Sequence, residues 1–170
     1  NVVSADGKFA AIIARFLEQG ARVVLLGGPS DAEVVAQVKG HLPSPEGLVD
    51  LSGQLSLGQM GALLRRCRLL LGNDSGPLHL AVAVGTPVVG LYGPTSPANY
   101  GPFDRASTGS ARRLRAAPFD AQSIALYWGG PCSPCFGPGR RPKDSCDQSC
   151  LTQISVDQVW EAVQASLAGD

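Results

Sequence analysis

The chain has 170 residues, and its 14 basic and 14 acidic side chains balance to a net charge of zero. That length is enough for one domain with a sizeable core, and the charge balance argues against a nucleic-acid-binding surface. No apolar run reaches the roughly 20 residues of a membrane-spanning helix, and the N-terminus lacks a signal-peptide pattern. We therefore expect a soluble protein. Because the chain starts without methionine just before a predicted helix, we also expect a fragment of a larger one.

The first part of the chain alternates apolar helices with short apolar strands. The expected elements, in chain order, are a helix at 5–19, a strand at 22–26, a helix that begins near 31, a strand at 48–51 and a helix from 57. Ser30 or Asp31 is suited to cap the second helix, and Ser56 with Gln59 has the spacing of a capping box before the third. This alternation indicates an α/β fold, in which helices cover both faces of a parallel sheet.

Residues 69–94 are the most informative stretch. An apolar strand at 69–71 leads into the polar turn 73–76, a helix at 77–84 and a second apolar strand at 88–92. His79 is the only polar side chain of that helix, so we expect the helix to be enclosed on most sides. A polar turn that opens a buried helix is where α/β proteins bind anions, because free backbone N–H groups and the helix dipole point there. The sequence therefore predicts an anion site at this turn.

Other loops are expected at the same edge of the sheet. Ligands of parallel sheets gather at the carboxyl ends of the strands. In this chain those ends are the segments 27–29, 52–55, 73–76 and 93–95. We expect these loops to converge on one binding site.

Several motifs resemble the signature of glycosyltransferase family 9, the heptosyltransferases of lipopolysaccharide core assembly. The motifs are Asn73-Asp74-Ser75-Gly76-Pro77-Leu78-His79-Leu80-Ala81, Gly85-Thr86-Pro87-Val88-Val89 and Tyr92-Gly93-Pro94-Thr95-Ser96-Pro97. The segments 23–29, 51–57 and 150–155 are similar to that family as well. The resemblance covers nearly the whole chain but only half of such an enzyme. It implies a GT-B fold of two Rossmann-like domains, of which residues 1–170 form the C-terminal, nucleotide-sugar-binding domain and the N-terminal acceptor domain is absent.

The resemblance implies a donor-binding site without a catalytic base, because the family places its general base in the acceptor-binding domain. The donor-binding residues that it implies are Gly28, Pro29, Leu55, Asp74, Ser75, Gly76, His79 and Thr95. Backbone N–H groups of Ser75 and Gly76, with the Ser75 hydroxyl, would donate to the donor's diphosphate at the helix N-terminus. The family also often uses a basic residue within a Lys-x-Trp-Pro pattern near the first helix. Only Lys8 is available here, and the Trp-Pro is missing.

Structural alternatives stay open for several of these residues. His79 either aims its ring at the phosphates or is a satisfied core histidine. Asp74 binds sugar hydroxyls, holds a cation or caps the helix, since a carboxylate beside phosphates repels them. Leu55 flanks the nucleobase or belongs to the core, and the Thr95 hydroxyl contacts the donor or stabilises its own Gly-Pro turn. Asp31 and Glu33 either contact the ribose hydroxyls of the nucleotide or lie exposed to solvent at the start of a helix.

The cysteines require a separate interpretation. Cys67 lies on a predicted helix face and is expected to be inert core. A Cys/Pro/Gly-rich loop at 129–150 carries Cys132, Cys135, Cys146 and Cys150, and pairs of cysteines on either side of a loop have the spacing of a tetrahedral metal site. These side chains hold a structural zinc ion or an iron–sulfur cluster, form disulfides, or stay reduced as a cytoplasmic chain would keep them.

The end of the chain is partly readable. The segment 100–128 has no clear pattern, although residues 112–115 fit an edge strand or a basic surface patch. A C-terminal helix is expected at 155–168, with Ser155 as its N-cap and Gln158 at the capping-box position. We expect its apolar stripe to pack on its own domain.

Together with the resemblance, these observations predict the donor-binding half of an inverting glycosyltransferase. It would transfer heptose from a nucleoside diphosphate sugar, ADP-heptose in the first instance, to a lipopolysaccharide core acceptor. The reaction would need no obligatory cofactor, and the chain alone is expected to bind donor without transferring it. Its place would be the cytoplasmic face of the inner membrane, with peripheral contact and no nucleic-acid partner. The alternatives are a non-catalytic nucleotide-sugar-binding module, a metal-stapled interaction module and a GT-B sugar epimerase.

Overall fold

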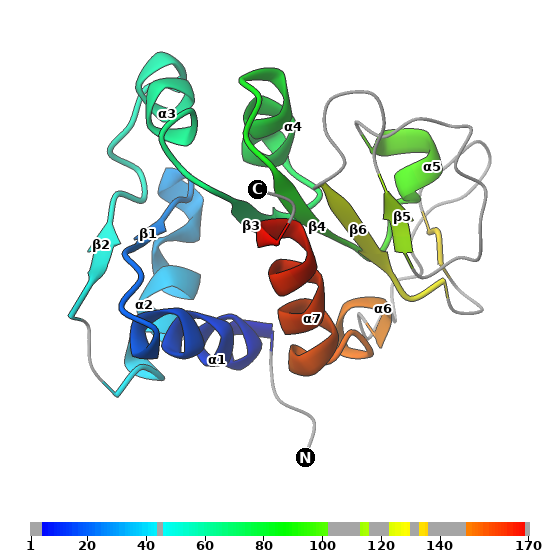
Figure 1. The fold of residues 1–170 in the computed structure, drawn as a ribbon, viewed down its shortest axis with the longest axis horizontal. Helices are drawn as coiled ribbons and strands as arrows, with labels where there is room; N and C mark the ends of the chain where they lie inside the picture. The colour runs from blue at the N-terminus through cyan, green and yellow to red at the C-terminus, as the bar shows by residue number, and fades with distance from the viewer. Residues whose placement is uncertain are drawn as a thin grey trace. The chain divides into compact units, whose positions relative to one another are not determined.

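The computed structural model describes residues 5–43, 46–101, 113–115, 123–129, 133–135 and 149–168. The chain divides into two compact units, Asn1–Gln59 and Met60–Asp170, and each is described by itself (Figure 1). Helix α3 (Leu57–Leu64) spans the boundary between them in the sequence. Among the described residues, no helix is long and apolar enough to cross a lipid bilayer.

The first unit contains a pair of parallel strands, β1 (Val23–Leu25) and β2 (Leu48–Asp50). Helix α1 (Ala5–Glu18) packs against β1 and against α2 (Ala32–Gly40), which follows a short 3-10 helix, η1 (Pro29–Asp31). Apolar side chains from both helices form the core, and the strands pack against it. The buried members of this core are Ala10, Ile13 and Val38.

Asp50, the last residue of β2, gathers hydrogen-bond donors from two directions. Its Oδ1 accepts the Ser52 hydroxyl at 2.6 Å and the Ser52 N–H at 3.1 Å. Its Oδ2 lies 2.9 Å from Nζ of Lys39 on α2. The hydrogen bond from the Ser52 hydroxyl, followed by that from Lys39, lowers the pKa of Asp50 to about 2. The ionised carboxylate therefore stabilises the connection between β2, its following loop and α2.

Acid is expected to destabilise the first unit through Asp50. A carboxylate whose folded pKa lies below its unfolded value of about 4 stabilises the fold above that pH, and this contribution is lost as the pH falls toward 2. Urea unfolding at about pH 5 and about pH 2 should show a smaller loss of stability in Asp50→Asn than in the wild type. Glu33→Gln, which changes an exposed carboxylate of α2, is the matched control and should behave as wild type. Equal acid sensitivity in Asp50→Asn and wild type would contradict this assignment.

The second unit contains a four-stranded sheet in the order β3-β4-β6-β5. Strands β3 (Leu70–Asn73), β4 (Val88–Tyr92) and β6 (Ile124–Tyr127) are parallel, and β5 (Arg113–Arg115) pairs antiparallel with β6 at the edge. Helix α4 (Gly76–Ala83) connects β3 to β4 and packs on both, so these three elements form a βαβ unit.

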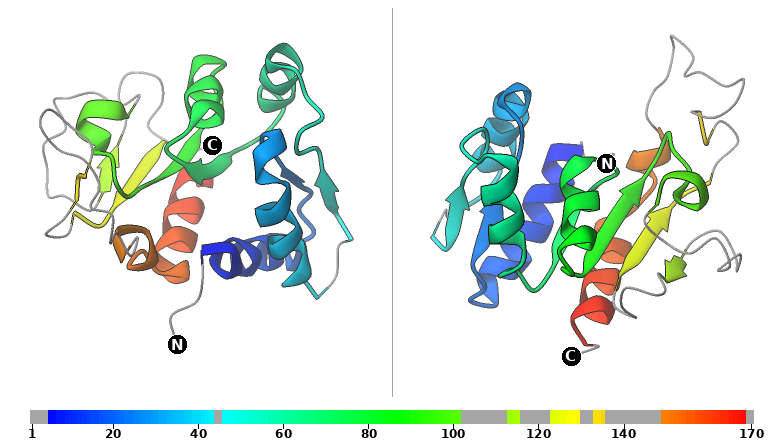
Figure 2. Two further views of the ribbon diagram at one scale, coloured as in Figure 1. Left: turned by 180° about the vertical axis from the view of Figure 1, so that it is seen from behind. Right: turned by 90° about the horizontal axis from the view of Figure 1, so that it is seen from above.

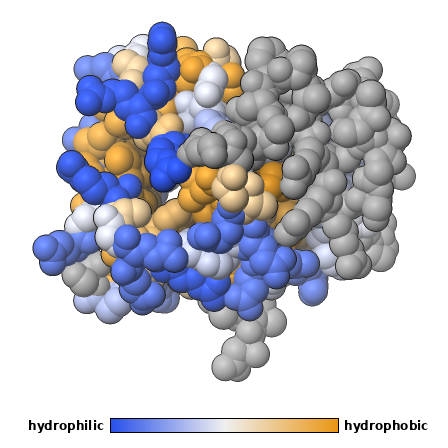
Figure 3. All heavy atoms as spheres, viewed as in Figure 1, coloured by the Kyte–Doolittle hydropathy of each residue, from blue (hydrophilic) through white to orange (hydrophobic). Residues whose placement is uncertain are grey.

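The C-terminal helix covers the other face of this sheet. Helix α7 (Val156–Leu167) packs on β4 and β6, and the views in Figure 2 place α4 and α7 on opposite faces. The predicted capping box is confirmed, because Ser155 Oγ accepts the Gln158 N–H at 3.2 Å and Gln158 Oε1 accepts the Ser155 N–H at 2.9 Å. The exposed positions of α7 are polar, namely Asp157, Gln158, Glu161 and Gln164, and hydrophilic atoms dominate the lower part of the face drawn in Figure 3. The α/β fold with helices on both faces is thereby confirmed.

Two expectations about local structure were wrong. Only Leu78 and Ala81 of α4 are buried, because the helix packs one side on the sheet while Ala83 and His79 face outward. The helix is therefore not enclosed on most sides, although it is apolar nearly all round. Cys67 does not lie on a helix face but follows α3 in a half-buried turn, where its Sγ donates to the Leu63 carbonyl at 3.5 Å.

The structure also shows how α2 begins and which strands form the edge of the sheet. Asp31 stands at the N-cap of α2, but its side chain makes no bond to that helix and instead accepts the Gly28 N–H at 2.7 Å. The basic segment at 113–115 is indeed an edge strand, whereas β6 had no recognisable pattern and was not predicted. Two short helices, α5 (Pro97–Tyr100) and α6 (Ser149–Thr152), complete the second unit.

Candidate functional site

Asp74 connects two neighbouring loops at the carboxyl ends of β3 and β4. It directly follows β3, and its N–H donates to the Leu91 carbonyl of β4 at 3.2 Å. Its Oδ2 accepts the Thr95 hydroxyl at 2.6 Å, and its Oδ1 lies 3.3 Å from His79 Nε2. The structure therefore brings together the predicted site residues Asp74, His79 and Thr95, which parallel strand ends place at one edge of the sheet.

The structure excludes one structural alternative for His79 and one for Asp74. The His79 side chain is 47% exposed, so it is not a core histidine. The Asp74 side chain is 14% exposed, and both of its oxygens face polar partners, Thr95 and His79. Asp74 is also not the helix cap, because Ser75 is the N-cap residue of α4. Asp74 contacts the Thr95 and His79 side chains, and its part in donor binding stays a prediction.

The N-terminus of α4 presents unused backbone donors. Ser75 has extended dihedral angles, φ −158° and ψ 170°, and its hydroxyl donates to the Asn73 carbonyl at 3.1 Å rather than to the helix. Within the described residues, the N–H groups of Ser75 and Gly76 have no hydrogen-bond acceptor, and Pro77 has no N–H. A Cβ added to Gly76 would meet no atom within 4 Å. Two N–H groups without a protein acceptor therefore lie at the positive end of the helix dipole.

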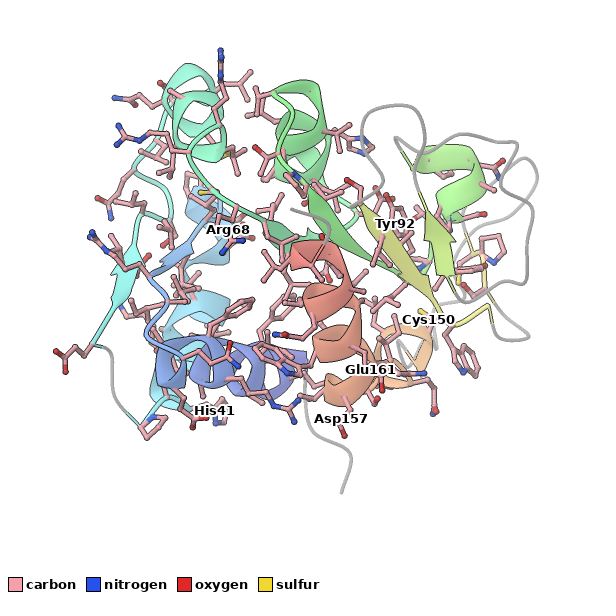
Figure 4. All side chains as sticks on the ribbon, viewed as in Figure 1. His41, Arg68, Tyr92, Cys150, Asp157 and Glu161 are labelled. Atoms are coloured by element: carbon pink, nitrogen blue, oxygen red, sulfur yellow. The ribbon has the colours of Figure 1, made fainter. Side chains whose placement is uncertain are left out.

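A buried tyrosine packs near this cluster. Tyr92 ends β4, where Figure 4 labels it, and its side chain is fully buried. Burial, and to a lesser extent the negative charge of Asp74, raises the pKa of Tyr92 well above its usual range. The phenol therefore stays neutral at any physiological pH and cannot act as a base at this site.

The turn that carries Thr95 is held by residues far away in the sequence. The Ser133 hydroxyl donates to the Gly93 carbonyl, and the Cys135 N–H donates to the Pro94 carbonyl at 2.7 Å. Cys150, labelled on α6 in Figure 4, and its neighbour Leu151 lie against Gly93. A Cβ at Gly93 would approach Leu151 Cγ to 2.6 Å, so only glycine fits between the turn and α6. Sequence reasoning missed these contacts, since neither Ser133 nor Cys135 carries a motif that points to this turn.

The two loops that carry the predicted site residues of the first unit lie next to each other. The Gly53 N–H donates to the Gly27 carbonyl at 2.8 Å, and a Cβ at Gly53 would lie 3.7 Å from Pro29 Cα. The loops at 27–29 and 52–55 are thus neighbours, and Leu55 in the second of them is half-buried. Asp31 Oδ2 accepts the hydrogen bond of the Gly28 N–H, so this N–H is not available to a ligand.

Lys8, the basic residue considered for donor binding, lies on α1 of the first unit. Partial burial lowers the pKa of its ammonium group. Nothing in the structure tests whether it contacts a donor, and its role stays a prediction.

The cysteine-rich region is only partly described. Cys132 and Cys146 lie outside the described residues, whereas Cys135 and Cys150 are 7% and 3% exposed. Over the described ranges, no group of three or more His, Cys, Asp or Glu side chains is placed to hold a metal ion. The zinc site at Cys132, Cys135, Cys146 and Cys150 therefore stays a prediction.

Cys67 lies outside this region. Burial raises the pKa of its thiol, which keeps the thiol protonated, as expected for a structural cysteine.

Elemental analysis of the purified chain tests the zinc prediction. We expect about one zinc per chain, and loss of that zinc in Cys135→Ser and in Cys150→Ser, because tetrahedral sites need all four ligands. Cys67→Ser is the matched control and should keep the metal. Absence of zinc, with the cysteines present either as free thiols or as disulfides, would contradict the prediction.

The model of glycosyltransferase family 9 (heptosyltransferase) matches residues 6–128. This chain belongs to that family. It is 36% identical over 91 residues to lipooligosaccharide heptosyltransferase 2 of Haemophilus influenzae, a match that covers 52% of this chain and 26% of that protein. It is 37% identical over 93 residues to lipopolysaccharide heptosyltransferase 3 of Escherichia coli K12, covering 53% and 26%. The chain thus matches about a quarter of the length of these family 9 relatives.

Solved structures of the family share the fold. A family 9 glycosyl transferase from Veillonella parvula has a TM-score of 0.70 at 28% identity, covering all of this chain and 45% of the other. The Escherichia coli ADP-heptose lps heptosyltransferase II has a TM-score of 0.69 at 24% identity, covering 96% of this chain and 41% of the other. The family 9 fold therefore extends to the part of the chain beyond the matched residues 6–128.

Proposed function

We propose that this chain is the donor-binding half of an inverting glycosyltransferase. In this proposal it binds a nucleoside diphosphate sugar, ADP-heptose in the first instance, from which heptose passes to a lipopolysaccharide core acceptor. The observation that carries the proposal is the pair of unused N–H groups of Ser75 and Gly76, beside an exposed His79 held by Asp74. Family membership supplies the reaction class, and the relatives' names supply the sugar and the acceptor.

The proposed role of the N–H pair follows from the charge that develops during transfer. When the bond from the sugar's anomeric carbon to the diphosphate breaks, its electron pair stays with the diphosphate and increases the negative charge there. Fixed N–H donors at a helix N-terminus stabilise that charge without rearranging. The Ser75 hydroxyl, which donates to the Asn73 carbonyl, is not needed for this and serves the turn.

His79 and Asp74 have distinct roles in this proposal. An imidazolium ring donates from both of its nitrogens, so a His79 ring that gives Nε2–H to the Asp74 carboxylate would give Nδ1–H to a phosphate oxygen. Asp74 acts through His79 and Thr95, which accounts for a carboxylate close to an anion site. We propose no general base in this chain and expect the acceptor's proton to be removed by a group from an acceptor-binding half.

A panel of nucleotides tests donor binding. Calorimetric titration of the chain with ADP, UDP and GDP, and then with ADP-heptose, should show one site with a preference for one base. Failure of every nucleoside diphosphate to bind at millimolar concentration would overturn the proposal.

A transfer assay separates the half-enzyme from a complete one. The chain incubated with ADP-heptose and a lipopolysaccharide core acceptor should form no product, while binding of ADP-heptose persists. Robust transfer by the chain alone would contradict the assignment of the base to another half. We place the reaction at the cytoplasmic face of the inner membrane, reached by peripheral contact and without an obligatory cofactor.

A further inference from the structure

Hydrogen bonds to backbone carbonyl groups hold the turn at 93–95 in position. Pro94 has no N–H, so the turn offers the carbonyls of Gly93 and Pro94 as its main backbone anchors. The Ser133 hydroxyl donates to the first across 40 sequence positions, and the Cys135 N–H donates to the second at 2.7 Å. Leu151 lies against the turn at Gly93. The two hydrogen bonds that fix the turn therefore come from Ser133 and Cys135, which lie outside the segments that resemble the family.

Tyr127 connects Ser133 to the sheet. A serine hydroxyl has one proton and two lone pairs, and the proton of Ser133 points to the Gly93 carbonyl. The Tyr127 hydroxyl, 3.3 Å from Ser133 Oγ, is then the donor of that second contact. Tyr127 ends β6 and pairs with Tyr92 at the end of β4. The hydroxyl groups of Tyr127 and Ser133 thus bridge two strand ends through the turn.

The same turn carries Thr95 to the candidate site. Its hydroxyl donates to Asp74 Oδ2 at 2.6 Å, and Asp74 Oδ1 faces His79 Nε2 at 3.3 Å. We propose that Ser133, supported by Tyr127, is a positioning residue of the donor site, which sets the orientation of His79 through the turn, Thr95 and Asp74. The proposal rests on the proposed function for its ligand, whereas the geometry that it describes exists without a ligand.

The imidazole resonances of His79 test the geometry without any nucleotide. In Ser133→Ala, the ring nitrogen and Cε1–H resonances of His79 should move in the same direction as in Thr95→Val, because both changes release Asp74. Thr95→Ser and Ser133→Thr retain the hydroxyl and should restore the wild-type positions. His41, the other histidine of the chain, serves as an internal reference and should not move.

A second control separates positioning from general destabilisation. Ser155→Ala removes the capping box of α7, which lowers stability without touching the turn. Its melting temperature should fall at least as far as that of Ser133→Ala, while its His79 resonances stay at the wild-type positions. Equal movement of His79 in Ser155→Ala, or unchanged resonances in Ser133→Ala, would overturn the proposal.

Titration with ADP measures the consequence for binding. Loss of one hydrogen bond that holds the site should weaken ADP binding about three- to tenfold in Ser133→Ala, with a smaller loss in Tyr127→Phe. Ser155→Ala should bind ADP as wild type does. If the wild type binds no nucleotide, the proposed function fails while the His79 resonances still decide this inference. If the wild type binds ADP and Ser133→Ala binds it equally well, the inference fails and the proposed function stands.

Discussion

His79→Ala should weaken binding of a nucleoside diphosphate by about 10- to 100-fold, because it removes a charge-assisted hydrogen bond to the phosphates. The side chain is 47% exposed and is turned toward Asp74, so its loss should leave the core of the second unit intact. Calorimetry with ADP at low ionic strength measures the affinity, and the melting temperature checks the fold.

The chain contains a matched control for this change. His41→Ala alters the other histidine, an exposed residue at the C-cap of α2 in the first unit, and should leave ADP affinity unchanged. His79→Gln keeps a neutral donor in place of the ring and should fall between alanine and wild type. An ADP affinity within about twofold of wild type in His79→Ala would remove His79 from the proposed phosphate site.

Gly90→Ala should destabilise the second unit by about 2–3 kcal/mol, because an added methyl group has no room there. A Cβ at Gly90 would lie 2.8 Å from Tyr92 Cε2 and 2.9 Å from Leu78 Cδ1. Leu78 and Tyr92 are both fully buried, so neither can move without disturbing the packing of α4 on β4. Thermal unfolding should show a lower melting temperature, by about 5–10 °C.

Gly72→Ala is the matched control, since Gly72 on β3 pairs directly with Gly90 on β4. The two glycines lie side by side on neighbouring strands, yet a Cβ at Gly72 would meet no atom within 4 Å. Its substitution should therefore change stability little or raise it, because alanine restricts the unfolded chain. Similar losses of stability in Gly72→Ala and Gly90→Ala would show that any side chain at this level of the sheet is destabilising. The contact with Leu78 and Tyr92 would then not be the cause.

The sequence by itself determined the order of the elements up to β4 and predicted where an anion would bind. Apolar runs and the polar turn after β3 were enough, because a parallel sheet places the carboxyl ends of its strands together. Local signals such as the capping box at Ser155 and Gln158 were confirmed because they depend on residues three positions apart. The family signature in the same stretch was confirmed by the match over residues 6–128.

Only the tertiary structure shows which of the predicted site residues contact one another. Asp74 and Thr95 are 21 positions apart, and only the pairing of β3 with β4 turns them into a hydrogen-bonded pair. The exposure of His79 could not be read from an apolar helix, because it depends on which side of α4 meets the sheet.

The contacts of Ser133 and Cys135 with the turn at 93–95 were still harder to predict from the sequence. Ser133 reaches Gly93 across 40 positions, from a loop whose cysteine spacing left a metal site as one of several alternatives. A contact of that separation follows from how the chain returns to the sheet, and no periodic pattern or local motif encodes it. The sequence thus placed the turn that we predict to bind an anion, and the packing of distant segments decided which side chains contact the neighbouring turn at 93–95.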